Sequence, residues 1–387
     1  MPPDPLKPEN EDDVLKWLRL HLTKNVGSRT FAKLLKYFGD IDAVLQAGPN
    51  QLSCVSGISP KRARQIHNDL NQVDDEAELA LAQKLSVKII TLQSLQYPPL
   101  LRQIHDPPHI LYIRGEIIRS DKLAVAVVGS RSCSRYGQEQ ASRLSHLLAA
   151  AGFTVVSGLA RGVDAAAHRG ALAAKGRTIA VQGCGLATVF PPEHIELASQ
   201  IRQSGAVVSE LPLTFEPIGN NFPARNRIIA GMTLGTLVIE SRRRSGAQIT
   251  ARLAMDYNRE VLAVPGQIDS PGSSGPHQLI KDGAVLVENL EDIVSALGQV
   301  GNILHNHAAQ SATDTKDQVE PTLFDDADFN LTAIERKIID FLDNDPTHID
   351  QIIRHTDYTP GQVNAAATSL QLKGLVKQLP GSFYHKR

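Results

Sequence analysis

The sequence predicts an α/β protein: an extended Rossmann-like parallel sheet with an N-terminal all-helical domain and a C-terminal winged helix. Eight short apolar runs alternate with helical stretches over residues 86–298: VKIITL, ILYIRG, LAVAVVGS, FTVVSG, TIAVQG, AVVSEL, TLVIES and VLAVPG. Nearly continuous apolar strands separated by helices specify a parallel sheet covered on both faces. Helical periodicity alone precedes this region, over residues 14–85, and a polar linker, three helices and a hairpin follow it.

The N-terminal domain, residues 14–85, is expected to be SAM-like or helix-hairpin-helix-like. Its helical periodicity begins at Val14, and two segments, NVGSRTFAKLL and VSGISPKRARQI, each place an apolar residue and a glycine turn before a helix. A helix that starts after such a turn offers unpaired N–H groups to a DNA phosphate. A helical domain that uses these turns only for packing is an equally good interpretation, so no site residue is assigned here.

The last part of the sequence predicts a tethered module. Residues 299–330 are polar and acidic, which predicts a flexible linker. Residues 331–387 predict helices over 332–342, 349–355 and 360–373, followed by LVKQLPGSFYHKR, the pattern of a winged helix. The third helix of such a fold can enter the major groove of DNA. Protein contact or simple packing fits the same pattern, because this helix carries few base-reading side chains.

Composition limits the possible partners and the compartment. Forty Lys and Arg against 41 Asp and Glu give a formal net charge of −1, so an anion-binding surface must come from local clustering. The three cysteines show no disulfide or zinc spacing, which indicates a reducing compartment, and the Pro-rich, acidic start is not a secretory signal. No apolar stretch reaches the roughly 18–20 residues that span a bilayer. We expect a cytoplasmic protein with no membrane partner.

Phosphate-binding chemistry follows the third apolar run, LAVAVVGS. In an open α/β sheet the carboxyl ends of the strands build the ligand crevice, so the residues just after each run are informative. Here Gly129 allows close approach to the backbone, Ser130 and nearby N–H groups can donate to an anion, and Arg131 can hold a phosphate with two hydrogen bonds. The segment is neither a Walker loop nor GxGxxG, so the standard nucleotide-cofactor motifs are absent and no cofactor is predicted.

The fourth run, FTVVSG, ends in the same way. Ser157 and Gly158 close this strand, Arg161 precedes the next helix, and Lys175 follows that helix, where it could reach a phosphate. Since parallel strands end at one edge of their sheet, the residues after the third and fourth runs are expected to share a crevice.

Acidic residues near these strand ends leave an enzymatic alternative open. Asp164 and His168 lie four residues apart on one helix face, which would suit a metal site or an acid–base pair. An Asp near a helix N-terminus more often complements the helix dipole, and no second carboxylate is near in sequence, so no metal is predicted. Glu210 and Glu240 end two other strands and could act on a glycosidic bond; we favour a role in orienting nearby arginines.

The strongest cluster is NNFPARNRIIAG followed by ESRRRSGAQITA. Phe222, Arg225 and Arg227 combine an aromatic plane with cations, the combination that binds single strands by base stacking and phosphate pairing. Ser245 and Gly246 precede a helix and so offer a further N-terminal anion site. The three arginines before Ser245 add charge, or form only a solvated run.

At this point the sequence resembles a known family. GSRxxxxYG, SGxARGVDxxAH, a Lys after the helix, FPxRNRIIAG and SGAxITA, in this order over residues 95–290, are similar to the DNA-processing protein A (DprA/Smf) family. The resemblance implies a homodimeric, non-enzymatic protein that binds single-stranded DNA and loads the RecA recombinase onto it during natural transformation. It also implies a DNA groove formed by Gly129, Ser130, Arg131, Ser157, Gly158, Arg161, Lys175, Phe222, Arg225, Asn226, Arg227, Ser245 and Gly246.

Two loops depart from the pattern of that family. GCGLATVFPPEH has Ala187, Phe190 and His194 where Asp, Tyr and Asn are usual, and SPGSSGPHQLI has His277 where Asn is usual. These loops are therefore not assigned to the groove. No quoted motif carries the dimer or recombinase surface, so those residues stay unassigned.

Two other classes of function fit parts of the sequence. Nucleotide phosphoribohydrolases of the lysine-decarboxylase-like type share Rossmann-like folds, but they need a PGGxGT loop and a following Glu, and the matching region here reads SGAQITA. A sequence-specific regulator that acts through the winged helix is less favoured, because the third helix of that domain has few base-reading side chains and the central domain is large. The sequence therefore favours a single-strand binding protein over an enzyme.

Overall fold

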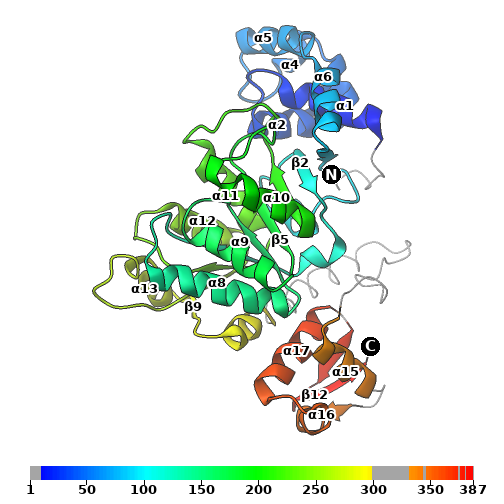
Figure 1. Cartoon of the computed structure of the whole chain (residues 1–387). Coiled ribbons are helices and arrows are strands. Elements are labelled where there is room, and N and C mark those ends of the chain that lie inside the picture. The colour runs from blue at the N-terminus through cyan, green and yellow to red at the C-terminus, as the bar shows by residue number, and fades with distance from the viewer. Residues whose placement is uncertain (1–9, 299–330, 343–345, 374, 380, 387) are drawn as a thin grey trace.

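The computed structural model describes residues 10–298 and 331–386, except residues 343–345, 374 and 380. The flexible linker predicted over 299–330 lies outside the described residues. In what is described, the chain forms a helical N-terminal domain, a nine-stranded sheet covered by helices, and a small C-terminal domain with its own three-stranded sheet (Figure 1). The predicted fold class is confirmed.

Six helices form the N-terminal domain, drawn in blue in Figure 1. Several begin at a polar residue whose side chain accepts a hydrogen bond from the first turn, as Asn10 does from the Asp13 N–H and Asp40 from the Ala43 N–H, both at 2.7 Å. The apolar faces pack around Trp17 and Phe31. The helices are α1 (Glu11–Leu22), α2 (Ser28–Phe38), α3 (Ile41–Gln46), α4 (Pro49–Leu52), α5 (Pro60–Leu70) and α6 (Asp75–Lys84).

All eight predicted strands form, and a short ninth completes a sheet with the order β1-β2-β6-β5-β4-β3-β7-β8-β9. The strands from β6 to β9 are parallel as predicted, but β1 pairs antiparallel to β2 and β2 antiparallel to β6. The strands are β1 (Lys88–Thr91), β2 (Ile110–Gly115), β3 (Ala124–Val128), β4 (Thr154–Ser157), β5 (Thr178–Val181), β6 (Ala206–Ser209), β7 (Gly235–Val238), β8 (Glu260–Ala263) and β9 (Val285–Leu286).

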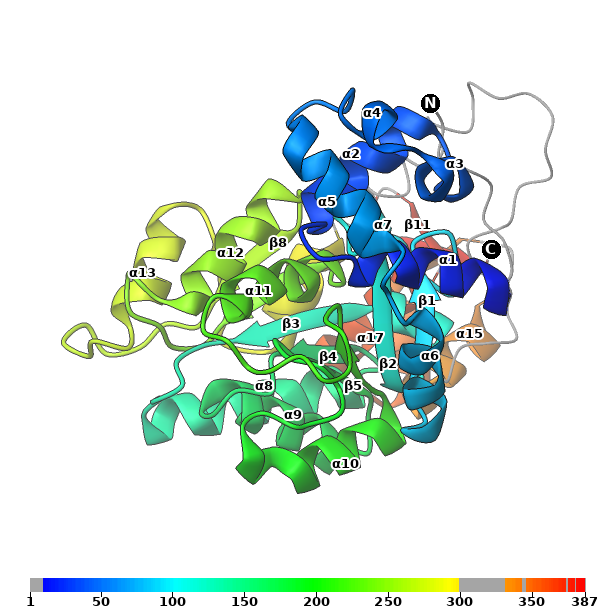
Figure 2. The same cartoon turned by 90° about the horizontal axis from the view of Figure 1, so that it is seen from above.

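Helices cover both faces of this sheet, which is why its central strands are buried on every residue. In β3, Val125 and Val127 share a core with α8 and α9, whereas Ala126 and Val128 share another with α11 and α12 (Figure 2). A 3-10 turn precedes β3 (Arg119–Lys122) and another precedes α10 (Pro192–His194). The helices are α7 (Pro99–Arg102), α8 (Arg135–Ala150), α9 (Val163–Ala173), α10 (Ile195–Ser204), α11 (Asn221–Gly231), α12 (Gly246–Asp256), α13 (Ser274–Lys281) and one over 290–298.

The N-terminal domain is packed onto the sheet through apolar side chains. Trp17 and Phe31 belong to one buried cluster with Ile110 and Tyr112 of β2. The Phe31 ring also stacks on His109, just before β2, with ring centroids 4.1 Å apart. Because the two domains share a core, residues of the α1–α2 turn are held at a fixed place beside the sheet.

The C-terminal domain is the predicted winged helix. Capping boxes at Thr332 with Glu335 and at Thr359 with Gln362 start two of its helices. Inside it, the Lys373 ammonium lies 2.6 Å from the Glu335 carboxylate. No helix in the described ranges is long and apolar enough to cross a membrane. The elements are α15 (Ala333–Phe341), β10 (Thr347–His348), α16 (Ile349–Thr356), α17 (Pro360–Leu372), β11 (Val376–Leu379) and β12 (Phe383–Lys386).

Gly115 ends β2 where that strand pairs with β6, and we expect one added methyl group there to lower the free energy of unfolding strongly. Gly115 has φ +98°, and a Cβ there would collide with the carbonyl oxygen of Gly205, which accepts the Glu116 N–H. Gly283 has φ +104° with nothing within 4 Å of its virtual Cβ. Each Gly→Ala substitution costs about 1–3 kcal/mol in backbone strain, and G115A should cost clearly more because it adds the clash. Urea unfolding checks this; equal losses in G115A and G283A would contradict it.

Candidate nucleic-acid interface

The carboxyl ends of β3 and β7 form the centre of the site. These strands are neighbours whose following helices, α8 and α12, lie on opposite faces of the sheet, so they bracket a topological switch point, where α/β proteins bind ligands. The Ser130 N–H donates to the Glu240 carbonyl at 2.7 Å, and the Val163 N–H donates to the Ser130 carbonyl at 3.2 Å. Backbone hydrogen bonds therefore lock the first turn of α9 to both strand ends.

The small residues at these strand ends are required by close packing within the protein. A Cβ on Gly129 would lie 2.6 Å from Cγ2 of Val163. Gly162 has φ +73°, and a Cβ there would collide with the Ser130 carbonyl oxygen. The Ser157 hydroxyl is buried and donates to the Val127 carbonyl at 2.6 Å. We expected Gly129 and Ser157 to contact a ligand, whereas the space around them is taken by neighbouring strands and by the start of α9.

Arg225 on α11 is buried and bonded to two strand ends. Its Nη1 donates to the Gly158 carbonyl at 2.7 Å and to the Val181 carbonyl, so one guanidinium joins β4 and β5. A Cβ on Gly158 would lie 2.5 Å from Nη2 of Arg225. Burial lowers the pKa of this guanidinium to about 10, with Asp164 opposing the shift, so the group stays charged at neutral pH. Arg225 therefore shapes the crevice rather than facing solvent.

Its two neighbours on α11 are also bonded inside the protein. The Asn226 amide donates to the Gly246 carbonyl at 3.2 Å, which ties α11 to the start of α12. Arg227 pairs with Glu210, and its Nε lies 3.7 Å from a carboxylate oxygen of Asp106. Burial raises the pKa of the Glu210 carboxyl while the Arg227 charge opposes that shift. The prediction that Glu210 orients an arginine is confirmed.

We predicted that Glu240 orients an arginine, but its carboxylate bonds the start of a helix instead. Its carboxylate accepts hydrogen bonds from the Ser134 N–H at 2.8 Å and from the Ser134 hydroxyl at 2.5 Å. Ser134 is the N-cap of α8, so a negative charge sits at the positive end of that helix dipole. The prediction for Glu240 was therefore wrong in its partner, because this carboxylate bonds the start of α8.

Asp164 and His168 have structural partners. Oδ2 of Asp164 accepts the Gly158 and Ala160 N–H groups at 3.1 and 3.3 Å, and the His168 ring is buried with Nδ1 2.7 Å from the Thr178 hydroxyl. Among the residues that the structure describes, no group of three or more His, Cys, Asp or Glu side chains could hold a metal ion. Asp164 thus organises the turn before α9, as its helix-start position suggested.

The solvent-facing part of the crevice is an aromatic and cationic surface. The Arg131 guanidinium lies over the Phe222 ring, 5.3 Å from its centroid, and the Phe190 ring lies 5.5 Å from that of Phe222. Arg161 is exposed and pairs with Glu193. Phe190 was not among the predicted site residues, because it departs from the family pattern. Its place in a segment that follows a strand end, like that of Phe222, is the sequence signal that could have identified it.

The start of α12 closes the other side of the crevice. Gly246 opens this helix and is exposed, and Ser245 is its N-cap without a side-chain capping bond. The Ser245 hydroxyl oxygen is buried and has no hydrogen-bond partner within the described chain. The three preceding arginines, Arg242, Arg243 and Arg244, are all exposed. A helix N-terminus beside exposed guanidinium groups favours an anion at this point.

Lys175 lies at the opposite edge of the sheet. It follows α9, whose 11 residues run back from the strand carboxyl ends over about 16 Å, and it precedes the first residue of β5. The structure therefore does not bring Lys175 together with the other predicted site residues. The length of the helix separates them, so we leave Lys175 out of the crevice proposed below.

Fold and site together define a Rossmann-like protein with a crevice of cationic and aromatic side chains and two accessory domains. The family described as DNA recombination-mediator protein A matches residues 88–298, the DprA-like N-terminal HHH domain matches residues 11–70, and the DprA winged helix domain matches residues 322–382. The chain belongs to the DNA recombination-mediator protein A family, also called DprA/Smf.

Named relatives agree with this assignment. The chain is 32% identical to Protein Smf of Synechocystis, over 96% of this chain and 98% of that protein. It is 38% identical to Protein Smf of Escherichia coli, over 81% of each chain. The crystal structure of DNA processing protein A from Streptococcus pneumoniae is 32% identical, covers 74% of this chain and 98% of its own, and matches with a TM-score of 0.64. The similarity thus extends beyond the central domain.

Burial of the neutral His168 ring predicts acid sensitivity. Desolvation lowers the pKa of His168 to about 3, whereas the unfolded chain takes up this proton near pH 6.5. The histidine contribution to stability is therefore complete above pH 6.5 and falls as the pH drops towards 3, by about 2 kcal/mol between pH 7 and pH 5. His168→Gln should reduce that decrease. Urea titrations at pH 7, 6 and 5 measure it, and an identical pH dependence in H168Q would rule the account out.

Proposed function

We propose that this protein binds single-stranded DNA along the carboxyl edge of the sheet. One observation carries the proposal: the exposed Arg131 guanidinium lies over the half-buried Phe222 ring, at a switch point next to the start of α12. Aromatic planes stack unpaired bases, and guanidinium groups and a helix N-terminus hold the phosphates between them. The path runs past Gly129, Ser130, Arg131, Arg161, Phe222, Ser245 and Gly246.

Binding of this kind is insensitive to base sequence. The exposed groups of the crevice are guanidinium groups and backbone N–H groups, which contact phosphates, and aromatic faces, which accept any base. The formal net charge of −1 gives no general attraction to DNA. Affinity therefore comes from the local cluster that includes Arg131, Arg161 and Arg242–Arg244, and it should fall with increasing salt.

We further propose that the bound strand is passed to the RecA recombinase in the cytoplasm during natural transformation, by a homodimer and without a catalytic step. Membership of the DNA recombination-mediator protein A family supports this proposal, and a Streptococcus pneumoniae relative that is 41% identical over 51% of this chain is named DNA processing protein DprA. Recombinase filament formation on DNA coated with single-strand binding protein tests the transfer. Filaments should form faster with the protein; no acceleration by a protein that binds the strand would refute transfer alone.

Arg131→Ala should weaken single-strand binding about equally on all sequences, because a phosphate contact positions the strand without reading it. The slope of log affinity against log salt should decrease by about 0.7 for the lost contact. Lys175→Ala is the matched control, since Lys175 lies at the far edge of the sheet and is also exposed to solvent. Fluorescence anisotropy with labelled oligonucleotides gives both quantities. If K175A lowers the single-strand affinity more than R131A does, the strand binds at the opposite edge of the sheet and the proposal is contradicted.

Phe222→Ala should cost roughly 1–3 kcal/mol in single-strand affinity, the range for a stacked base. Phe222→Leu is the control, because leucine keeps an apolar contact with Gly183 and Phe190 but removes the ring. Both variants should lose affinity while F222L keeps its melting temperature. If F222L binds as well as the parent protein and F222A only melts earlier, then Phe222 is a packing residue and the stacking proposal fails.

A further inference from the structure

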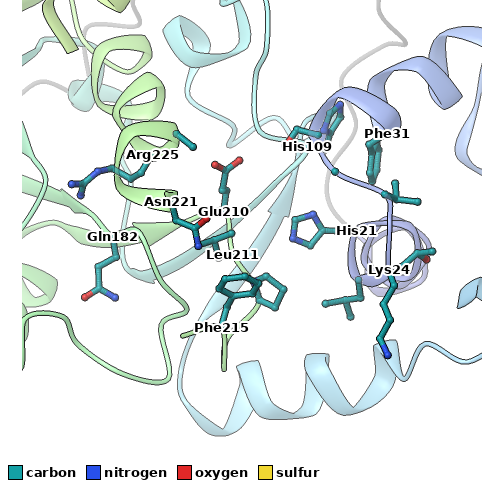
Figure 3. A pocket seen from close by; sticks show the side chains of 17 residues that line it. His21, Lys24, Phe31, His109, Gln182, Glu210, Leu211, Phe215, Asn221 and Arg225 are labelled. Atoms are coloured by element: carbon teal, nitrogen blue, oxygen red, sulfur yellow. The ribbon is translucent and has the colours of Figure 1, made fainter. Parts of the chain in front are cut away.

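A cavity of about 480 Å³ lies between the N-terminal domain and the sheet (Figure 3). Its walls come from the end of α1 and the start of α2, from His109 before β2, and from the segments that follow β5 and β6. Volumes of about 300–1,000 Å³ are typical of sites for small molecules and cofactors. The cavity opens at the same sheet edge as the proposed DNA crevice, because Gln182, Asn221 and Arg225 line it.

Two polar groups of this cavity are buried without a hydrogen-bond partner in the described chain. They are Nε2 of His21, at the end of α1, and the side-chain amide nitrogen of Asn221, at the start of α11. The Glu210 backbone lies beside the His21 ring but leaves Nε2 without a hydrogen bond of good geometry. In Figure 3 both side chains point into the space between the two domains. A buried polar group left unpaired costs about 1–3 kcal/mol. A ligand that supplies partners for both groups would recover that cost.

Aromatic side chains form much of the remaining wall. Phe31 is buried and stacked on His109, and Phe215 lies at the rim with 36% of its surface exposed. Aromatic faces and edges therefore surround a space that is larger than a single water molecule needs. Flat, partly polar rings suit such a wall, since base–aromatic stacking tolerates any base.

Charge is distributed unevenly across the cavity. The half-buried Glu210 carboxylate, already paired with Arg227, lines the cavity, where it repels an anion but can accept hydrogen bonds from the N–H groups of a base. The exposed Lys24 and the first residues of α2 lie at the other side. Gly27 is the N-cap of α2 and has no side chain to cap the helix, so the first N–H groups of α2 have no side-chain partner where that helix start lines the cavity. The arrangement fits a molecule with a flat polar ring inside and a phosphate outside.

We propose that this interdomain cavity binds one nucleotide unit, with its base between Phe215, His21 and Asn221 and its phosphate at the start of α2 beside Lys24. The proposal rests on the proposed single-strand binding, which it extends: the strand passes Phe222 and Asn221 on neighbouring positions of α11 and inserts an unstacked nucleotide next to them. The N-terminal domain is then part of the binding surface rather than a passive neighbour.

Two variants test the cavity while leaving the crevice intact. Phe215→Ala removes the aromatic ring at the rim of the cavity. Tyr37→Ala is its control, since Tyr37 is an exposed aromatic residue of the N-terminal domain that does not line the cavity. Ala224→Leu adds bulk to the cavity wall with a good helix former. Both F215A and A224L should weaken binding of oligodeoxythymidine about five- to tenfold, the low end for one stacked base, and Y37A should bind as the parent protein does.

Photo-crosslinking with oligonucleotides that carry 5-iodouracil locates the contact, and saturation-transfer NMR with deoxynucleoside monophosphates tests the free nucleotide as the source. Crosslinks to peptides that contain residues 21–31 or 210–215, lost in A224L, support insertion from the strand. A monophosphate signal lost in A224L, without such crosslinks, supports a free nucleotide. Neither signal, with unchanged oligonucleotide affinity in F215A and A224L, overturns the proposal.

The same measurements separate this proposal from the broader one. If the parent protein binds single strands and R131A does not, while the cavity variants bind normally and give no monophosphate signal, only the cavity proposal fails. If the parent protein binds no single strand, the proposed function fails, and the monophosphate arm alone then decides whether the cavity is a nucleotide site.

Discussion

The buried guanidinium of Arg225 is the interaction on which the crevice depends. Parallel strands β4 and β5 end with carbonyl groups that have no further strand to bond, and Arg225 satisfies those of Gly158 and Val181 together. Its charge is balanced by the buried Asp164, which in turn accepts the Gly158 N–H. Gly158 must lack a side chain because the guanidinium occupies that space. One ionic group therefore fixes two strand ends and α11 relative to one another.

This anchoring explains how a chain of almost no net charge can present a cationic surface. The cations of α11 are used internally, so the exposed positive charge comes from the loops after β3, β4 and β7, where Arg131, Arg161 and Arg242–Arg244 lie. The rigid backbone beneath them, held by the Ser130 to Glu240 hydrogen bond, keeps Arg131 over Phe222. A preorganised surface loses little side-chain entropy when a flexible strand binds.

Much of the fold could be predicted from the sequence, because apolar runs and helical periodicity report burial directly. All eight strands and the winged helix follow from those patterns. The antiparallel pairing of β1 and β2 could not be predicted, since an apolar run does not state its direction. Nor could the burial of Arg225 and Arg227, because α11 is buried on every side from Arg225 onwards and shows no periodicity. The placement of Lys175 was within reach, given the length of α9.

The most direct test is a comparison of three ligands under one set of conditions: a single strand, the duplex of the same sequence, and a mononucleotide, each titrated against the whole protein at several salt concentrations. The account predicts tight binding of the single strand, little dependence on base sequence, and an affinity that falls linearly on a log-log salt plot with a slope of about −0.7 for each phosphate held. Preference for the duplex, or single-strand binding that does not change with salt, would contradict the account.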